Sequence, residues 1–156
     1  MKFSRLIVSL TLALTSAAAF ASDYLTIQLK DGPVVIKLSP DVAPQNVARI
    51  KALATSGKYN DVAFHRVIDG FMAQTGDVQF GNLRKGLDAT LVGTGGSSAP
   101  DLPAELSNIP FDRGVVGMAR SSDPNSANSQ FFIVFAPSYF LNGQYTVVGK
   151  VVSGMD

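Results

Sequence analysis

The most informative part of the sequence is the stretch Phe64-His-Arg-Val-Ile-Asp-Gly-Phe-Met-Ala-Gln-Thr-Gly-Asp77. It holds two short apolar runs, 64–68 and 71–74, separated by an Asp-Gly pair typical of tight hairpin turns. Alternation along a strand places Met72 and Gln74 on one face. The stretch therefore predicts two short strands joined by a turn.

On the N-terminal side, the pattern changes from strand to helix. Residues 24–30 alternate between apolar and polar side chains, and a second Asp-Gly pair connects them to an apolar run over 34–38. Pro44 suits the first turn of a helix, Gly57 suits its end, and the residues between them form one apolar stripe: Val47, Ile50, Leu53 and Ala54. We predict a hairpin followed by one helix.

On the C-terminal side, residues 77–108 are rich in Gly, Ser and Pro and show no sustained period. Loops of this length in compact domains are usually functional. Three further apolar runs follow, over 115–119, 130–135 and 145–152. With about seven short strands, one helix and no internal repeat, the chain predicts one mainly β domain, either an antiparallel barrel or a sandwich.

Composition narrows the function classes. The chain has 156 residues, of which 46% are hydrophobic and 16% charged, which excludes a disordered protein. The formal net charge of +1 argues against nucleic-acid binding through bulk charge. There is no cysteine and only one histidine, His65, so cysteine-ligated zinc and multi-histidine sites are excluded. We expect neither a metal nor a cofactor, and nothing indicates more than a monomer.

The first residues predict an export signal. Two cations lie within Met1–Arg5, and the apolar stretch 6–20 ends in Ala19-Phe20-Ala21, the small-x-small pattern of a signal-peptidase site. A membrane anchor is the alternative, but this stretch is shorter than the roughly 20 apolar residues that span a bilayer. We predict a signal peptide over 1–21 and a mature domain over 22–156 that is periplasmic or secreted and, after cleavage, not bound to a membrane.

The quoted stretch and several later motifs together resemble the cyclophilin family of peptidyl-prolyl cis-trans isomerases, in its bacterial periplasmic form. The further motifs are Gly93-Thr-Gly-Gly96, Gly117-Met-Ala-Arg-Ser121, Asn128-Ser-Gln-Phe-Phe-Ile133, Phe140-Leu-Asn-Gly and Val147-Val-Gly-Lys-Val151. The resemblance runs in order from about Leu25 to Asp156. It implies a closed eight-stranded antiparallel β-barrel capped by α-helices, with the active site on the outer face. Family members usually continue beyond the equivalent of Asp156, so we expect this chain to lack their C-terminal helix and last strand.

The resemblance also assigns site residues. It names Arg66, Gln74 and Phe71 as catalytic, with Arg66 as the catalytic arginine and Gln74 binding the substrate backbone. Phe71 also belongs to the proline pocket. The substrate-binding residues complete that pocket, the groove beside it and the aromatic rim: Met72, Phe132 and Leu141; Gln130, Ala119 and Arg120; and Phe140 and Tyr145. The partners that the resemblance implies are proline-containing polypeptides.

Elementary chemistry agrees with these roles. An X–Pro amide rotates slowly because resonance gives its C–N bond double-bond character, with a barrier of roughly 18–20 kcal/mol. The twisted amide is less polar than the planar one, and its prolyl nitrogen gains a lone pair. An apolar pocket and a donor aimed at that nitrogen therefore bind the transition state more tightly than the ground state. Arginine is a permanent donor. The predicted activity is acceleration of X–Pro rotation in exported or folding proteins.

Alternative interpretations stay open at this point. The barrel could be a non-catalytic proline-peptide-binding module or chaperone, or a small-molecule carrier, and Arg66 could be a surface ion-pair residue. Because its parity is opposite to that of Arg66, we expect His65 to be a structural residue that hydrogen-bonds within the fold. We expect the core to contain Met118, Phe131 and Ile133.

Four features depart from the family pattern. Phe140 occupies a position that is tryptophan in many members, and it lacks the indole N–H that donates to the inhibitor cyclosporin, so we expect weak cyclosporin binding. Tyr145 replaces a common histidine. Arg120 replaces a small polar residue, and its charge raises the hypothesis that substrates with acidic neighbours are favoured. The segment 78–92 is longer than the family minimum by roughly ten residues and could reshape the groove rim.

Overall fold

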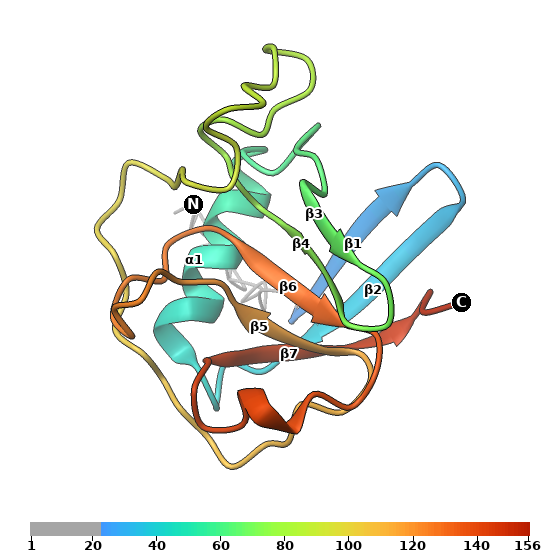
Figure 1. Ribbon diagram of the computed structural model, residues 1–156, viewed down its shortest axis with the longest axis vertical. Coiled ribbons are helices and arrows are strands. Elements are labelled where there is room, and N and C mark those ends of the chain that lie inside the picture. The colour runs from blue at the N-terminus through green and yellow to red at the C-terminus, as the bar shows by residue number, and fades with distance from the viewer. Residues whose placement is uncertain (1–22) are drawn as a thin grey trace, which may run out of the picture.

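The computed structural model describes residues 23–156 as a curled sheet of seven antiparallel strands and one α-helix (Figure 1). The predicted signal peptide over 1–21 lies outside the described residues. No helix within 23–156 has the length and apolar character that crossing a bilayer requires. The mainly β architecture predicted from the sequence is confirmed.

The strands form one sheet in the order β1-β2-β7-β5-β6-β4-β3. The elements are β1 (Tyr24–Leu29), β2 (Gly32–Leu38), α1 (Pro44–Thr55), β3 (Arg66–Ile68), β4 (Met72–Thr75), β5 (Val115–Met118), β6 (Phe131–Val134), the 3-10 helix η1 (Tyr139–Leu141) and β7 (Val147–Ser153). All seven predicted strands and the helix are present at or near their expected positions. In the β3–β4 turn, Gly70 has a φ of 69°, a left-handed conformation that favours glycine.

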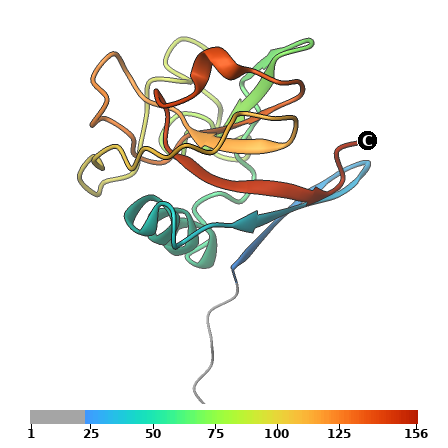
Figure 2. The same cartoon turned by 90° about the horizontal axis from the view of Figure 1, so that it is seen from below.

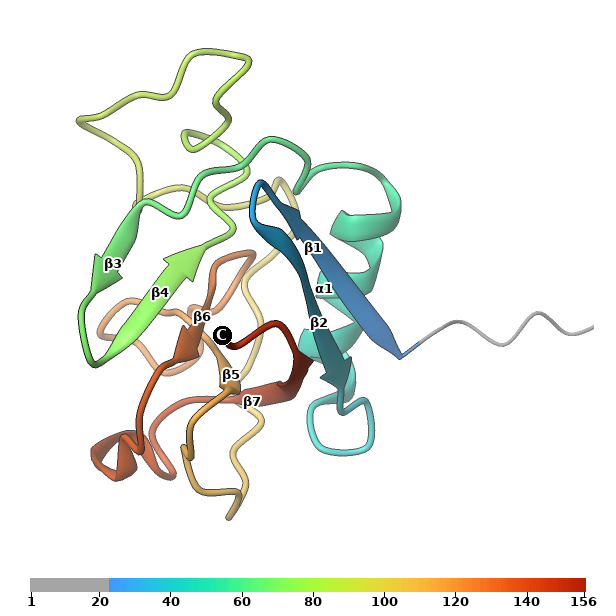
Figure 3. The ribbon, with the colours of Figure 1, turned by 90° about the vertical axis from the view of Figure 1, so that its right-hand side faces the viewer.

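The closed eight-stranded barrel is not formed by residues 23–156. The sheet is a half-barrel whose edge strands, β1 and β3, each pair with one neighbour and not with each other (Figure 3). No eighth strand and no second α-helix follow β7 in the described residues. The inner face is consequently uncovered at β3: Val67 is 60% exposed, whereas its neighbours in the sheet, Ala73 and Ile133, are 8% and 6% exposed.

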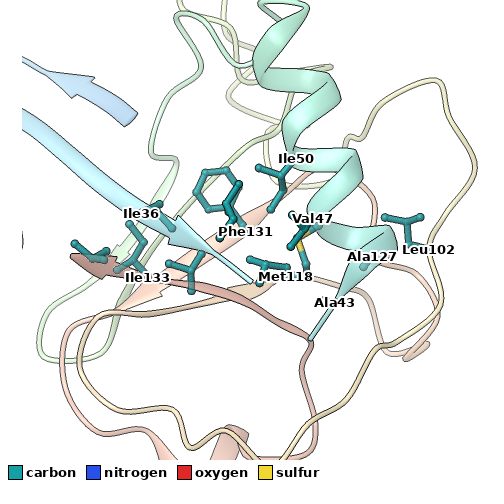
Figure 4. Close-up of a cluster of buried hydrophobic side chains, with 13 residues drawn as sticks. Ile36, Ala43, Val47, Ile50, Leu102, Met118, Ala127, Phe131 and Ile133 are labelled. Atoms are coloured by element: carbon teal, nitrogen blue, oxygen red, sulfur yellow. The ribbon is translucent and has the colours of Figure 1, made fainter. Parts of the chain in front are cut away.

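The concave face of the sheet and one side of α1 enclose the main core (Figures 2 and 4). Val47 and Ile50 of α1 pack in the same cluster as Ile36 of β2 and Phe131 of β6. Met118, Phe131 and Ile133 are buried, so their expected core positions are confirmed. Because α1 covers the concave side of the sheet, the opposite, convex face is left to form the functional surface.

A second, smaller apolar cluster lies on the convex face. It contains Phe111 and Phe132, whose rings stack with centroids 5.9 Å apart. Gly117 of β5 makes this stack possible, because a Cβ there would lie 2.6 Å from Cζ of Phe132 and 2.9 Å from Cε1 of Phe111. The remaining members are Met72, Val115, Val134, Leu141 and Val147. This cluster supports the cavity described below.

Glu105 caps the N-terminus of α1 from a segment distant in sequence. Its carboxylate accepts hydrogen bonds from the backbone N–H groups of Gln45 (3.1 Å) and Asn46 (2.9 Å) and from Asn46 Nδ2 (2.7 Å). Partial burial raises the pKa of Glu105, but the hydrogen bonds from Asn46 and Gln45 outweigh burial, so the pKa lies below its usual value. The cap ties the long β4–β5 connection to the helix.

We expect Glu105→Gln to lower the free energy of unfolding by about 1 kcal/mol at neutral pH, as loss of a helix cap does. Because the folded-state pKa is depressed, the carboxylate stabilises the fold above its unfolded pKa of roughly 4.3. This stabilisation is lost as the pH falls through the lower, folded-state pKa. Urea unfolding of both proteins at pH 7 and pH 3 checks this. An equal difference at the two pH values would contradict the assignment.

Candidate active site

An apolar cavity of about 480 Å³ opens on the convex face of the sheet. Its apolar lining comes from three parts of the chain that are far apart in sequence: Phe71 and Met72, Phe132, and Leu141 and Tyr145. Arg66, Gln74, Ala119 and Arg120 also line it. The structure thus brings nine of the eleven predicted site residues around one cavity.

Strand register explains how the polar residues reach this cavity. Arg66 of β3 pairs with Gln74 of β4, which pairs with Phe132 of β6. Side chains directly opposite one another in neighbouring strands share a face of the sheet. The row therefore places a guanidinium, an amide and an aromatic ring side by side on the convex face. Phe71 lies in the β3–β4 turn and reaches the cavity from outside the row.

A chain of hydrogen bonds fixes the polar side of the cavity. Arg66 Nη1 donates to Gln74 Oε1 (3.4 Å), and Gln74 Nε2 donates to Gln130 Oε1 (2.9 Å). Gln130 Nε2 donates in turn to the carbonyls of Gly93 (3.0 Å) and Gly95 (2.8 Å). Gln130 is buried, whereas Arg66 is exposed, so the chain runs from a fixed loop to a solvent-facing cation. Gln130 therefore positions Gln74 and, through it, Arg66.

We expect Gln130→Met to lower kcat/KM on a proline peptide about tenfold, because it frees Gln74 and leaves two loop carbonyls without a donor. The effect should fall mainly on kcat, since the apolar lining stays in place. Steady-state kinetics of the two proteins measure this split. Gln28→Met, at an exposed glutamine of β1, is the matched control and should leave both constants unchanged. A wild-type kcat for Gln130→Met would contradict the positioning role.

The two remaining predicted residues lie beside the cavity. Gln130 lines a neighbouring cavity, and Phe140 is 72% exposed at the rim. The Phe140 ring contacts Phe71 with centroids 5.4 Å apart, and Tyr145 meets Phe132 edge-on at 5.6 Å. The Phe140 ring therefore extends the apolar lining outward.

The neighbouring cavity, of about 600 Å³, is lined mainly by glycines and polar side chains, and we call it the polar cavity. It shares Gln74, Ala119 and Arg120 with the apolar cavity, together with part of the 93–97 loop. Its other lining residues are Asp101, Ser121, Ser126, Asn128, Ser129 and Gln130. An extended polypeptide lying across the shared residues could place one side chain in each cavity.

Asp77 holds the loop that lines both cavities, a role that no pattern in the sequence predicted. It is fully buried, and its carboxylate accepts four backbone hydrogen bonds, from Gln79 (3.0 Å), Phe80 (2.9 Å), Gly93 (2.7 Å) and Gly95 (3.0 Å). The sequence shows an acidic residue at the end of an apolar run, but nothing in it links that residue to glycines 16 and 18 positions later.

The expectation that His65 hydrogen-bonds within the fold is wrong for the described residues. Both ring nitrogens are buried and have no hydrogen-bond partner there. The ring instead packs against the loop, where a Cβ on Gly93 would lie 3.4 Å from it. Steric packing rather than hydrogen bonding therefore defines its contact. Within residues 23–156, no cluster of three histidine or acidic side chains could hold a metal ion.

Comparison with known proteins gives a consistent result. Residues 24–156 match the family model described as cyclophilin type peptidyl-prolyl cis-trans isomerase/CLD. A probable peptidyl-prolyl cis-trans isomerase of Brucella suis biovar 1 is 67% identical over 142 residues, which cover 91% of this chain and 72% of the relative.

Solved structures show the same similarity. A cyclophilin type peptidyl-prolyl cis-trans isomerase of Cryptosporidium parvum, crystallised in the presence of the dipeptide Ala-Pro, superposes with a TM-score of 0.72 at 31% identity. The match covers 84% of this chain and 79% of that one. A cyclophilin from Hirschia baltica also gives 0.72, at 26% identity, over 86% of this chain and 65% of that one.

Proposed function

Because the chain belongs to the cyclophilin family of peptidyl-prolyl cis-trans isomerases, we propose that it accelerates rotation about X–Pro bonds, with Arg66 stabilising the twisted amide beside the apolar cavity. The observation that carries the proposal is the row of Arg66, Gln74 and Phe132, which sets a cation and an amide against an apolar lining. In this proposal, the proline ring of the substrate enters the apolar cavity. The substrate amide then lies at its polar edge.

The chemistry needs only these groups. Planar and twisted amides differ most at the prolyl nitrogen, whose lone pair is available only in the twisted form. A guanidinium N–H directed at this nitrogen binds the transition state selectively, and the apolar surroundings disfavour the more polar planar amide. Gln74, fixed by Gln130, holds the substrate backbone while the bond turns. No covalent bond is made or broken.

A cis/trans exchange assay on a short peptide with one proline tests the proposal. Magnetisation transfer between the cis and trans proline resonances measures the rate at equilibrium. Activity in a folded wild-type protein supports the enzyme. Binding of the peptide without faster exchange would support the alternative, a non-catalytic proline-binding module or chaperone.

We also propose that the protein works on exported polypeptides, as a monomer, in the periplasm or as a secreted protein. The support is the N-terminal sequence, in which two cations precede an apolar stretch and an Ala-Phe-Ala site. N-terminal sequencing of the protein recovered from cell fractions, together with light scattering, tests this. A protein that retains its first 21 residues in the cytoplasmic fraction would overturn the localisation.

For the fold, we propose that a further strand closes the half-barrel between β1 and β3. A cavity of about 770 Å³ lies beside the length of β1 and reaches Thr75 of β4 and Phe131 of β6. Val67, on the inner face of β3, is exposed at the other edge. Hydrogen exchange in the protein isolated from cells tests closure: β1 amides that are not bonded to β2 exchange slowly if another strand pairs with them and rapidly if the edge is open.

We expect weak inhibition by cyclosporin and a gain in Phe140→Trp. Phe140 is exposed at the rim, so a larger ring fits without repacking the core and adds an indole N–H donor. The substitution should lower the inhibition constant about tenfold, as one added hydrogen bond can. Titration of the isomerase activity with cyclosporin measures it. Phe140→Tyr serves as a control for added size, and tight inhibition of the wild type would contradict the prediction.

A further inference from the structure

Arg120 presents a positive charge in a fixed orientation. Its Nε and Nη2 donate to the carbonyl of Gln144 (3.1 and 2.9 Å), and its Nη1 donates to the carbonyl of Ser121 (2.9 Å). The guanidinium carbon lies 4.5 Å from the centre of the Tyr145 ring. These contacts hold one rotamer of a side chain that is usually mobile, so little ordering is left for a ligand to impose.

The charge of Arg120 is not neutralised within residues 23–156. Its hydrogen-bond acceptors are neutral carbonyls, and the ion pairs in this range involve other cations, namely Lys30, Lys51 and Arg84. A guanidinium has five N–H donors, and the contacts with Gln144 and Ser121 use three of them. Arg120 therefore keeps donors for a ligand.

The location of Arg120 matters as much as its charge. Its side chain lines both the apolar cavity and the polar one. The other charged groups that line these cavities are Arg66, in the apolar cavity, and Asp101, in the polar cavity, where it accepts a hydrogen bond from Asn128 Nδ2 (2.9 Å). With two cations and one carboxylate, the combined lining of the two cavities carries a net positive charge.

We propose that Arg120 is a specificity-determining residue that selects proline-containing segments with a carboxylate side chain, Asp or Glu, next to or near the proline. The inference rests on the proposed function and names its preferred substrates. If the proline of a segment occupies the apolar cavity, its neighbouring residues lie near Arg120, which lines both cavities. A carboxylate there gains a charge-assisted hydrogen bond to a donor that is already ordered, whereas a lysine is repelled.

The test uses acetyl-Ala-Ala-Ala-Pro-Phe-Ala-amide peptides in which one alanine at a time is replaced by Glu, Gln or Lys. Catalysed exchange is measured by magnetisation transfer, and the readout at each position is the ratio of kcat/KM for Glu to that for Gln. We expect a ratio of about three to five at one position in low salt, which is the upper range for a partly exposed ion pair. Lysine at that position should give the lowest value, and 0.5 M salt should reduce the ratio toward one.

Variants assign the preference to this residue. Arg120→Gln should bring the ratio to one, Arg120→Glu should reverse it in favour of Lys, and Arg120→Lys should keep part of it. Asp101→Asn, which retains an oxygen that can accept from Asn128, should raise the ratio. Lys37→Gln removes the same charge from an exposed position of β2 that lines neither cavity, and it should leave the ratio unchanged. Each ratio compares two peptides on the same protein. If a substitution at Arg120 alters packing against the Tyr145 ring, it therefore changes both rates alike and does not change the ratio.

The outcomes separate this inference from the proposed function. A wild type that turns over all peptides with a ratio of one at every position, or an Arg120→Gln variant that keeps the wild-type ratio, overturns the inference and leaves the isomerase intact. If no peptide is turned over, the proposed function fails. In that case, fluorescence anisotropy of labelled copies measures the equilibrium binding of the same peptides. The inference then stands if the Glu peptide binds more tightly than the Gln peptide, and it fails if the two affinities are equal.

Discussion

Replacing Arg66 by alanine is expected to lower kcat/KM on proline peptides by about 10²- to 10³-fold, the usual loss when one transition-state donor is removed. Arg66 is exposed, and its hydrogen bond to Gln74 is long at 3.4 Å. The fold therefore does not depend on it, and the free energy of unfolding should change by less than about 0.5 kcal/mol. The loss should appear in kcat, because the donor acts on the twisted amide.

Two variants make this result interpretable. Arg66→Lys keeps the charge but not the planar fork of donors, and we expect it to recover only part of the activity. Arg84→Ala removes an exposed arginine that pairs with Asp61 and lines neither of the two cavities, and it should behave as wild type. Exchange rates and thermal unfolding are measured on all three. An Arg66→Ala protein with more than half of the wild-type kcat/KM would contradict the proposed role of Arg66 in stabilising the twisted amide.

The second large effect is expected from Asp77→Ala, which should lower the free energy of unfolding by about 3 kcal/mol or more. The carboxylate is fully buried and accepts hydrogen bonds from four backbone N–H groups. Alanine leaves these donors without a partner in a place that excludes water. Gly93 and Gly95 are then released, and the loop that lines both cavities loses its position. Activity should fall together with stability.

Asp88 provides the matched control for this prediction. It lies at the surface of the same connection, and its carboxylate also accepts from two backbone N–H groups, those of Thr90 (2.9 Å) and Leu91 (3.2 Å). At the surface, water can replace the carboxylate as the hydrogen-bond acceptor. Asp88→Ala should therefore lower the free energy of unfolding far less than Asp77→Ala does. Asp77→Asn, which keeps one acceptor oxygen, should fall between the two. Urea unfolding ranks the proteins, and equal losses for Asp77→Ala and Asp88→Ala would show that burial is not the cause.

Some positions could be predicted from the sequence because they follow a local period. The alternation in 24–30 and the apolar stripe on 47–54 each fix a strand or a helix, since burying one face is what stabilises it. The same rule placed Met118, Phe131 and Ile133 in the core, where they are found. Parity likewise put Met72 and Gln74 on one face, and both line the apolar cavity.

Other positions could not be found in this way. Asp77 and Glu105 act through backbone groups of distant segments, and a hydrogen bond to a backbone N–H does not specify the identity of the residue that donates it. The environment of His65 also depends on a distant segment: its ring packs near Gly93, and the expected hydrogen bond is absent from the described residues. The closed barrel was inferred from resemblance, whereas residues 23–156 form an open sheet.

The sequence by itself determined the strands, the helix and the kinds of side chain available for chemistry, because these depend on periodicity and composition over a few neighbouring residues. Only the tertiary structure decided that Arg66, Gln74 and Phe132 stand in one row, that a buried glutamine holds that row to a loop, and that Arg120 faces both cavities without a carboxylate partner in the described chain. These arrangements depend on strand register and long-range hydrogen bonds, which join residues that no local pattern relates.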